Sequence, residues 1–351
     1  PILESPIMNN IVARGTPRLG IVLVNWNRWE DTIECLESIF RSSIPVRVVV
    51  VDNGSTNDSL AKIAAWAQGD VEAAAVSPAM TRFSTPPIPK PFACIALDAQ
   101  QAPETDPGSA LLTLVDGGGN LGFAAGNNLG LRHLLRDPSL DYFWLLNNDT
   151  VIETGAANAL VTRMDATHRV GMCGTVVRYY HRPNEIQALN GSRFSALSGT
   201  SQGIGRGQPI TMPFDPAKVA RDTDFVLGAS LGVSRRFIEV VGLMEESYFL
   251  YFEEIDWAYR NNDRFEIAFA HGAIVYHKEG HSIGSSATAG QRSPTAEYYL
   301  MRSRLAFVKR RQPLLLPVHW GISLAMIGRR LMRRQPEKAK VMTKALFGRP
   351  F

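Results

Sequence analysis

The chain of 351 residues is 45% hydrophobic and 20% charged, enough to bury a full core in one large domain or two ordinary ones. Its three cysteines form no close pair and have no His at ligand spacing, which argues against a disulfide framework or a zinc site. No apolar run reaches the roughly 18 residues of a membrane-spanning helix, and no charged segment followed by an apolar one opens the chain. We therefore expect a soluble protein in the cytoplasm.

Basic residues are concentrated at the C-terminal end. Residues 301–351 hold thirteen of the 37 Lys and Arg residues but only one of the 33 Asp and Glu residues. The net charge of +4 thus conceals an acidic body and a strongly basic tail. Such a tail indicates either an anionic partner, such as a membrane surface or a polyanion, or a solvated helix.

Strand and helix patterns alternate along most of the chain. Buried-strand patterns occur at 19–24, 46–51, 111–115, 142–146, 170–179, 224–233, 266–270 and 273–276. Helical patterns occur at 31–40, 59–66, 155–164 and 235–241, and in the segment that ends near Leu135. This order predicts an α/β fold with mostly parallel strands and right-handed crossovers.

Local signals refine this outline. Asp31 is expected to cap the first helix, with Glu34 as its capping-box partner. Residues 1–18 show no periodicity and are expected to form an irregular lead-in. Residues 68–108 lose the pattern and include a Pro-rich run, so they predict a surface insertion with one edge strand at 92–97.

The strand at 142–146 ends abruptly in polar residues. Asn147, Asn148, Asp149 and Thr150 follow the apolar run directly. In open α/β sheets ligands bind at the carboxyl ends of the strands, so these side chains are expected at a ligand site. The competing interpretation is a strand followed by an ordinary Asn/Asp turn.

A glycine-rich loop follows the strand at 111–115. Its Gly117-x-Gly119-x-x-Gly122 spacing satisfies the dinucleotide-binding fingerprint. The match is weak, because that fingerprint normally follows the first strand of its unit and needs an acid at the end of the next strand, where this chain has Asn147. The glycines still allow backbone N–H groups to approach a phosphate or a ribose.

Three carboxylates occur within four residues behind an aromatic run at 248–252. Glu253, Glu254 and Asp256 either open an exposed helix, where the macrodipole favours them, or include a catalytic acid whose pKa an apolar wall raises. His277 ends the last predicted strand, where a His is more often structural than a ligand.

Six short motifs occur in an order that resembles a known enzyme family. They are Asn-Trp-Asn at 25–27, Asp-Asn-Gly-Ser-Thr at 52–56, the Gly- and Asn-rich loop at 119–128, Asn-Asn-Asp-Thr at 147–150, the aromatic and acidic block at 249–256, and His277. Over residues 19–310 the chain resembles the family 2 inverting glycosyltransferases of GT-A fold, in particular the bacterial rhamnosyltransferase-like branch.

The resemblance implies a role for each of these polar residues. Asp149 would hold a divalent cation, Mg²⁺ or Mn²⁺, that bridges the diphosphate, and His277 would complete the metal site. Asn147 replaces the first acid of the family's Asp-x-Asp motif, which leaves one carboxylate fewer for a hard cation. Glu254 would be the general base. Nucleotide-binding residues would be Asn25, Asp52, Asn120, Gly122 and Asn148.

The same likeness implies a division of the chain. Residues 19–300 would form the catalytic domain, with a nucleotide-sugar-binding half at 19–150 and an acceptor-binding half at 151–300. Residues 301–351 would form a basic helical tail. Within it, the mainly apolar stretch 314–327 lies between basic residues and predicts peripheral binding to an anionic membrane, on the inner face of the plasma membrane. The alternative is that this stretch packs on the catalytic domain.

The implied function is transfer of a sugar, with rhamnose as one candidate, from a dTDP- or UDP-sugar to a hydroxyl of a saccharide or lipid-linked saccharide in bacterial cell-surface polysaccharide assembly. Inverting transfer needs a carboxylate to take the acceptor proton and positive groups to stabilise the departing diphosphate. No nucleic-acid partner is expected. Two other classes are a NAD-dependent oxidoreductase using the loop at 117–122 and a catalytically inactive sugar-nucleotide-binding protein.

Overall fold

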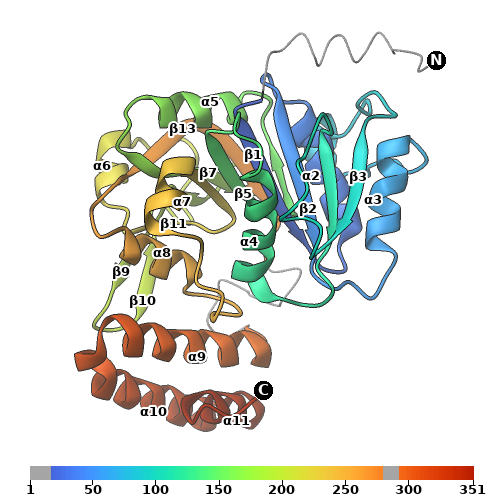
Figure 1. The fold of residues 1–351 in the computed structure, drawn as a ribbon. Helices are drawn as coiled ribbons and strands as arrows, with labels where there is room; N and C mark the ends of the chain where they lie inside the picture. The colour runs from blue at the N-terminus through green and yellow to red at the C-terminus, as the bar shows by residue number, and fades with distance from the viewer. Residues whose placement is uncertain (1–16, 280–291) are drawn as a thin grey trace, which may run out of the picture.

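The computed structural model describes residues 17–279 and 292–351, and a ten-stranded mixed sheet forms its centre (Figure 1). The strands of this sheet are β1 (Leu19–Asn25), β2 (Val46–Asp52), β3 (Cys94–Asp98), β4 (Leu112–Asp116), β5 (Tyr142–Asn147), β6 (Thr150–Ile152), β7 (Val170–Tyr179), β8 (Ile186–Leu189), β12 (Ser230–Ser234) and β13 (Glu266–His277). A smaller sheet contains β9 (Gly191–Ser195), β10 (Thr200–Gly203) and β11 (Phe225–Val226).

Most neighbouring strands of the large sheet are parallel. Its order is β3-β4-β2-β1-β5-β12-β7-β13-β6, with β8 paired to β7. The first five strands in this order are parallel, whereas β12 is antiparallel to both β5 and β7, and β13 is parallel to β7. The carboxyl ends of β1, β2 and β5 therefore meet at one edge of the sheet.

Helices cover both faces of the sheet. Alternate residues of a strand point to opposite sides, so a strand that is apolar throughout presents apolar side chains to both faces. Leu19 and Ile21 pack against one helical layer, whereas Val22 packs against the other. The first layer contains α2 (Trp29–Phe40), α3 (Ser59–Gln68) and α5 (Ala156–Asp165), and the second contains α4 (Gly122–Leu134), α7 (Arg235–Val241) and α8 (Glu253–Asn261). The predicted α/β fold with a mostly parallel sheet flanked by helices is confirmed.

The predicted helical extension at the C-terminal end is also confirmed. It comprises α9 (Pro294–Arg311), the short 3₁₀ turn η2 (Pro313–Leu315), α10 (Leu316–Met332) and α11 (Pro336–Leu346), which form a layer below the sheet in Figure 1. Tyr298 and Met301 of α9 pack with Met342 of α11. Among the residues described, no helix combines the length and apolar character needed to cross a bilayer.

The predicted capping box on α2 is wrong. This helix begins at Trp29, and Arg28 stands at its N-cap without a side-chain hydrogen bond. Asp31 and Glu34 are buried instead, and their carboxylates lie 2.5 and 2.6 Å from Lys278 Nζ. A buried cation must be paired with negative charge, so both acids pair with Lys278 and do not cap the helix.

Other expectations need smaller corrections. The insertion at 68–108 is partly buried, because Met80 and Phe83 of η1 (Pro78–Phe83) pack against Tyr276 and other residues of the sheet. The strands expected at 266–270 and 273–276 form one strand with a bulge. The strand expected at 224–233 is interrupted at 227–229, between β11 and β12. Residues 1–16 of the expected lead-in lie outside the described residues.

Candidate active site

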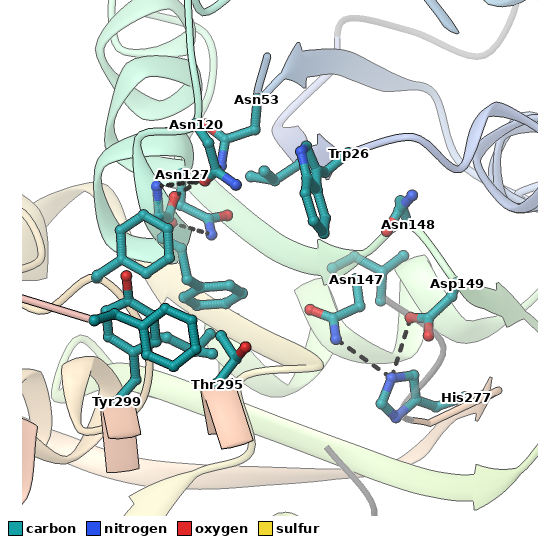
Figure 2. A pocket seen from close by; sticks show the side chains of 17 residues that line it. Trp26, Asn53, Asn120, Asn127, Asn147, Asn148, Asp149, His277, Thr295 and Tyr299 are labelled. Atoms are coloured by element: carbon teal, nitrogen blue, oxygen red, sulfur yellow. Dashed lines mark hydrogen bonds and ion pairs between the residues drawn. The ribbon is translucent and has the colours of Figure 1, made fainter. Parts of the chain in front are cut away.

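A pocket of about 330 Å³ lies at the carboxyl edge of the sheet, a volume typical of small-molecule sites (Figure 2). It is bounded by the ends of β1 and β5, the start of α4 and the start of α9. This is where open α/β sheets bind ligands. The polar side chains of its lining include Asn53, Asn120, Asn127, Asn147, Asn148, Asp149, His277, Thr295 and Tyr299.

Asp149 and His277 meet in this pocket. Asp149 follows β5 and His277 ends β13, and the Asp149 Oδ1 lies 3.1 Å from the His277 Nε2 (Figure 2). Both residues are buried, with 5% and 8% of their surface exposed. The Nδ1 of His277 lies 2.9 Å from the Gln187 Oε1, which can only accept, so Nδ1 carries a proton and Nε2 faces Asp149.

The two groups shift each other's pKa. Burial alone would raise the pKa of Asp149, but the charge and hydrogen bond of His277, together with Lys278, hold it below its usual range. Burial alone would lower the pKa of His277, but Asp149 raises it, with a smaller contribution from Glu279. In isolation the pair therefore favours its charged form, a carboxylate beside an imidazolium.

These ligands fit a divalent cation that also binds phosphate. Two ligands at about 2.1 Å from an octahedral ion lie about 3 Å apart, close to the separation of the Asp149 and His277 atoms. Within the described part of the chain, no group of three or more His, Cys, Asp or Glu side chains could hold a metal ion. The protein would thus supply two ligands of these types, and phosphate oxygens and water would complete the shell, as is usual for Mg²⁺.

Asn53 ties the glycine-rich loop to the end of β2. Its Nδ2 donates to the Gly122 carbonyl at 3.1 Å and to the Asn120 Oδ1 at 3.2 Å, while its Oδ1 accepts from the Leu121 N–H at 3.0 Å. Asn120 and Gly122 line the pocket, where the resemblance would place nucleoside-binding residues. Asn53 adjoins Asp52, but no signal in the sequence distinguishes it as a residue of the site.

The structure gives another reason for two glycines of the dinucleotide-like fingerprint. A Cβ at Gly117 would lie 2.8 Å from the Asp52 carbonyl oxygen, and one at Gly122 would lie 2.4 Å from the Phe249 carbonyl oxygen. Protein backbone therefore occupies the space that these glycines leave. Their spacing gives no separate support for a dinucleotide.

Two of the nucleotide-binding candidates lie behind the pocket. Asn25 is fully buried and donates to the Ser55 Oγ at 3.1 Å, and Asp52 Oδ1 accepts from the Ser55 N–H at 2.9 Å. Neither lines the pocket, so both shape the loop after β2. Asn148 does line it, and its Nδ2 donates to the Thr32 Oγ1 at 2.9 Å.

The C-terminal extension supplies one wall of the pocket, which sequence reasoning missed. Thr295 and Tyr299 of α9 line it, and the Tyr299 ring stacks on Phe249 with centroids 4.6 Å apart and planes 24° apart. No sequence motif marks these residues. Their role depends on the return of the chain to the sheet edge after β13.

Glu254 lies beside the pocket without lining it. Its carboxylate lies against Gly228, where a Cβ would come within 2.1 Å of the Glu254 Oε1. The next residue, Ala229, accepts a hydrogen bond from the Asn147 N–H at 3.0 Å. Glu254 is thus one loop away from the polar end of β5.

Glu253 and Glu254 have unequal surroundings. Burial raises the pKa of Glu254 to about 6. Glu253 is 2% exposed, its Oε2 has no hydrogen-bond partner among the described residues, and burial followed by the charge of Glu254 raises its pKa well above the usual range. Glu253 therefore favours its neutral form, whereas Glu254 can gain and lose a proton near pH 6.

The backbone before these acids is strained. Tyr251 and Phe252 have φ values of 67° and 73°, in the left-handed region, directly before α8. This conformation costs a residue other than glycine about 1–2 kcal/mol, and such strain clusters at functional sites. Here it starts α8 at Glu253.

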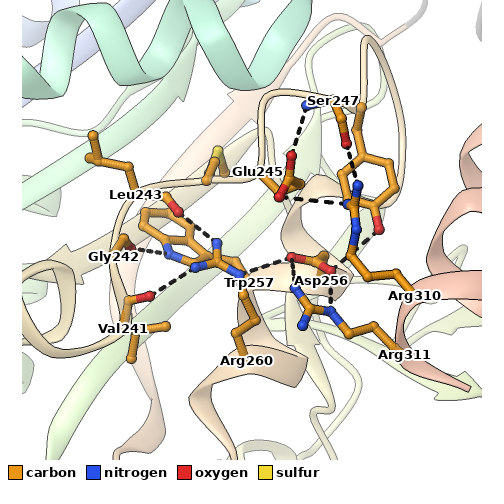
Figure 3. A network of polar contacts seen from close by, with 12 residues as sticks. Val241, Gly242, Leu243, Glu245, Ser247, Asp256, Trp257, Arg260, Arg310 and Arg311 are labelled. Carbon is orange, nitrogen blue, oxygen red and sulfur yellow. Dashed lines mark hydrogen bonds and ion pairs between the residues drawn. The ribbon is translucent and has the colours of Figure 1, made fainter.

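Asp256 is occupied by structural contacts (Figure 3). It is fully buried, its Oδ2 accepts from the Arg260 Nε at 2.9 Å, and its Oδ1 accepts from the Arg311 Nε at 2.7 Å. The Tyr248 hydroxyl adds a contact at 3.3 Å. Asp256 therefore joins α8 to the end of α9, which leaves Glu253 and Glu254 as the acids available for proton transfer.

Comparison with known proteins gives a partial match. No protein-family model matches the chain. A segment of 149 residues, 42% of this chain, is 27% identical to the low-salt glycan biosynthesis hexosyltransferase Agl10 of Haloferax volcanii. The match spans 45% of that protein, less than half its length.

Some solved structures resemble the chain at low sequence identity. The mannosyltransferase PcManGT from Pyrobaculum calidifontis, in complex with GDP-Man and Mn²⁺, is 15% identical with a TM-score of 0.46 over 96% of this chain and 77% of its own. S. aureus TarS 1-349 in complex with UDP-GlcNAc is 11% identical with a TM-score of 0.47 over 94% of this chain and 81% of its own. Likeness at these scores does not extend to individual site residues.

Proposed function

We propose that the protein is a glycosyltransferase that moves a hexose from a nucleoside-diphosphate sugar to an acceptor hydroxyl, with inversion at the anomeric carbon. The observation that carries this proposal is the Asp149–His277 pair in an amide-lined pocket at the carboxyl edge of the sheet. The partial likeness to a hexosyltransferase supports the same reaction class.

In this proposal Asp149 and His277 hold a divalent cation, Mg²⁺ or Mn²⁺. When bound, the cation offsets negative charge on the diphosphate. Gln187 keeps the His277 Nε2 directed at Asp149, and burial of both ligands strengthens their interaction with charge. The amides of Asn53, Asn120 and Asn148 supply neutral hydrogen-bonding groups, which suit a nucleoside.

Glu254 is the proposed general base. In a single displacement, the acceptor oxygen forms a bond to the anomeric carbon as the bond to the diphosphate oxygen breaks. The acceptor proton passes to the Glu254 carboxylate. A base with a pKa of about 6 is ionised at neutral pH yet basic enough to accept this proton.

Finer assignments follow the sequence resemblance. Residues 19–150 would bind a dTDP- or UDP-sugar, rhamnose being one candidate, and residues 151–300 would bind a saccharide or lipid-linked saccharide acceptor. α9 begins at Pro294 and reaches the pocket, so the extension would also contribute to substrate binding. The product would enter cell-surface polysaccharide assembly.

Thermal shift and turnover test this proposal together. UDP or dTDP with Mn²⁺ is expected to raise the melting temperature, whereas NAD is not. Incubation with a panel of nucleoside-diphosphate sugars, including dTDP-rhamnose, is expected to release nucleotide when an acceptor saccharide is present.

The outcomes distinguish the competing functions. Stabilisation by NAD alone would favour an oxidoreductase and would contradict the proposal. Stabilisation by UDP or dTDP without turnover of any donor would indicate a sugar-nucleotide-binding protein without catalytic activity.

A further inference from the structure

One face of α10 is apolar and exposed. Val318, Leu324 and Met332 are 43%, 56% and 80% exposed, and Leu314 in the preceding turn is 93% exposed. Gly321 and Ala325 are exposed between them. Val318, Gly321 and Ala325 recur at intervals of three and four residues, and Met332 follows two turns later, so they share one side of the helix, with Leu324 beside them. We call this set the α10 face.

The opposite side of α10 is fixed to the rest of the protein. His319 and Ser323 are fully buried: the His319 Nε2 lies 2.9 Å from the Ala196 carbonyl oxygen, and the Ser323 Oγ accepts from the Arg304 Nη2 at 2.7 Å. Arg330 forms a buried ion pair with Glu297 of α9. These contacts hold the α10 face outward, so its exposure is a property of the packed helix.

Basic residues precede and follow the α10 face along the chain. Residues 298–336 contain nine Lys and Arg residues and no Asp or Glu. Lys309, Arg329, Arg333 and Arg334 are exposed, and no ion pair is found for any of them among the described residues. The long apolar stems of such side chains can lie along an apolar surface while their charges reach outward.

We propose that the α10 face binds an anionic membrane surface, with the helix lying in the plane of the lipid headgroups. Apolar side chains of this kind enter the boundary between headgroups and acyl chains, and flanking cations attract anionic lipids. α10 has 17 residues and does not qualify as a spanning helix, which fits an in-plane position.

Charge favours an anionic membrane over a second copy of the chain as the partner of the α10 face. Symmetric pairing of two α10 faces would bring the same uncompensated cations together, and like charges close to each other oppose association. An anionic lipid surface neutralises those cations. The inference does not rest on glycosyl transfer, because binding is measured without a sugar donor.

The test is flotation of the full chain with vesicles of phosphatidylcholine and phosphatidylglycerol, compared with pure phosphatidylcholine. We expect binding to the anionic vesicles, and we expect Leu324→Glu/Met332→Glu to reduce it at least tenfold. The matched control is Val76→Glu/Val240→Glu, which changes two residues that are 64% and 47% exposed elsewhere on the surface. Equal melting temperatures would establish that both double variants are folded.

A charge variant tests the electrostatic part. Arg329→Gln/Arg333→Gln is expected to weaken binding to anionic vesicles about 25-fold, since each basic residue contributes about fivefold. Its control is Arg136→Gln/Arg236→Gln, which removes two other exposed arginines. Undiminished binding by both α10 variants would overturn the proposal. A second result would also overturn it: the unmodified chain does not bind vesicles but forms a dimer in sedimentation velocity, and Leu324→Glu/Met332→Glu dissociates that dimer.

Discussion

The buried Asp149 Oδ1 lies 3.1 Å from the His277 Nε2, in a pocket where the ends of two strands meet. Asp149 follows β5 and His277 ends β13, and the return of β13 to the sheet brings them together. Each holds the other in its charged form when no cation is present. Binding of a divalent cation at this point would displace the proton from the His277 Nε2.

Replacement of Asp149 tests the metal site. Asp149→Ala removes the only carboxylate of the pair, so we expect Mn²⁺-dependent UDP or dTDP binding and turnover to be lost. Asn147→Ala is the matched control, because a neutral amide contributes less to a cation, and its effect should be milder. Isothermal titration with and without Mn²⁺ measures nucleotide binding by both variants, and donor consumption measures their turnover. Unchanged affinity and turnover in Asp149→Ala would refute the assignment.

Replacement of Glu254 tests the general base. Glu254→Gln keeps the side-chain shape and removes its basicity, so turnover is expected to fall roughly 10²–10⁴-fold while nucleotide binding is retained. Asp256→Asn should instead lower the melting temperature, because Asp256 is paired with Arg260 and Arg311. If Glu254→Gln remains active while Glu253→Gln or Asp256→Asn loses turnover, the base is a different carboxylate.

The pH profile should report the pKa of Glu254. Its pKa is raised to about 6, and the base must be ionised, so kcat/KM is expected to fall about tenfold for each pH unit below this value. Initial rates between pH 4.5 and 8, at a fixed Mn²⁺ concentration, measure the profile. The residual activity of Glu254→Gln should lack this inflection, and a shared inflection would assign it to another group.

Glu253 should make stability depend on pH. Its pKa is raised well above 4.5 in the folded state, so between pH 4.5 and the folded pKa Glu253 is protonated more fully in the folded chain than in the unfolded chain. The free energy of unfolding then decreases as pH rises towards the folded pKa. Glu253→Gln removes this titration, so its melting temperature should change less between pH 5 and pH 8 than that of the unmodified protein. Equal changes would show that Glu253 is not the source.

Much of the fold can be predicted from the sequence, because β1 and β5 are unbroken apolar runs that end in polar residues, and β2 is such a run apart from Arg47. The edge that carries the pocket follows from the parallel order of these strands. Contacts between distant segments could not be predicted. Asp31 and Glu34 pair with Lys278 although their spacing indicates a capping box. No local pattern distinguishes an acid that caps a helix from one that pairs with a distant lysine.

The candidate site was predictable where chemistry and strand ends coincide, as at Asp149 and His277. It was not predictable where a residue acts through packing. Asp52 and Asn25 carry strand-end signals yet turn to Ser55, whereas Tyr299 carries no signal and lines the pocket. Side-chain direction at a loop depends on hydrogen bonds to other loops, which sequence spacing does not encode.

Gly122 joins the glycine-rich loop to the segment that precedes Glu254. Its φ is +80°, and the N–H of the next residue, Phe123, donates to the Phe249 carbonyl oxygen at 2.9 Å. A Cβ at Gly122 would lie 2.4 Å from that oxygen, so Gly122→Ala must either move the 249–252 segment or break the contact. Overpacking and a left-handed backbone together should cost about 2–4 kcal/mol of the free energy of unfolding.

Gly119→Ala is the matched control in the same loop. A Cβ at Gly119 has no atom within 4 Å, and its φ is not positive, so this change should leave the melting temperature nearly unaltered. Urea denaturation measures the cost of each change, and UDP or dTDP titration shows whether displacement of Phe249 also disturbs its stacking partner Tyr299 in the pocket. If Gly122→Ala is as stable as Gly119→Ala and binds nucleotide equally well, the close approach of the two segments does not shape the site.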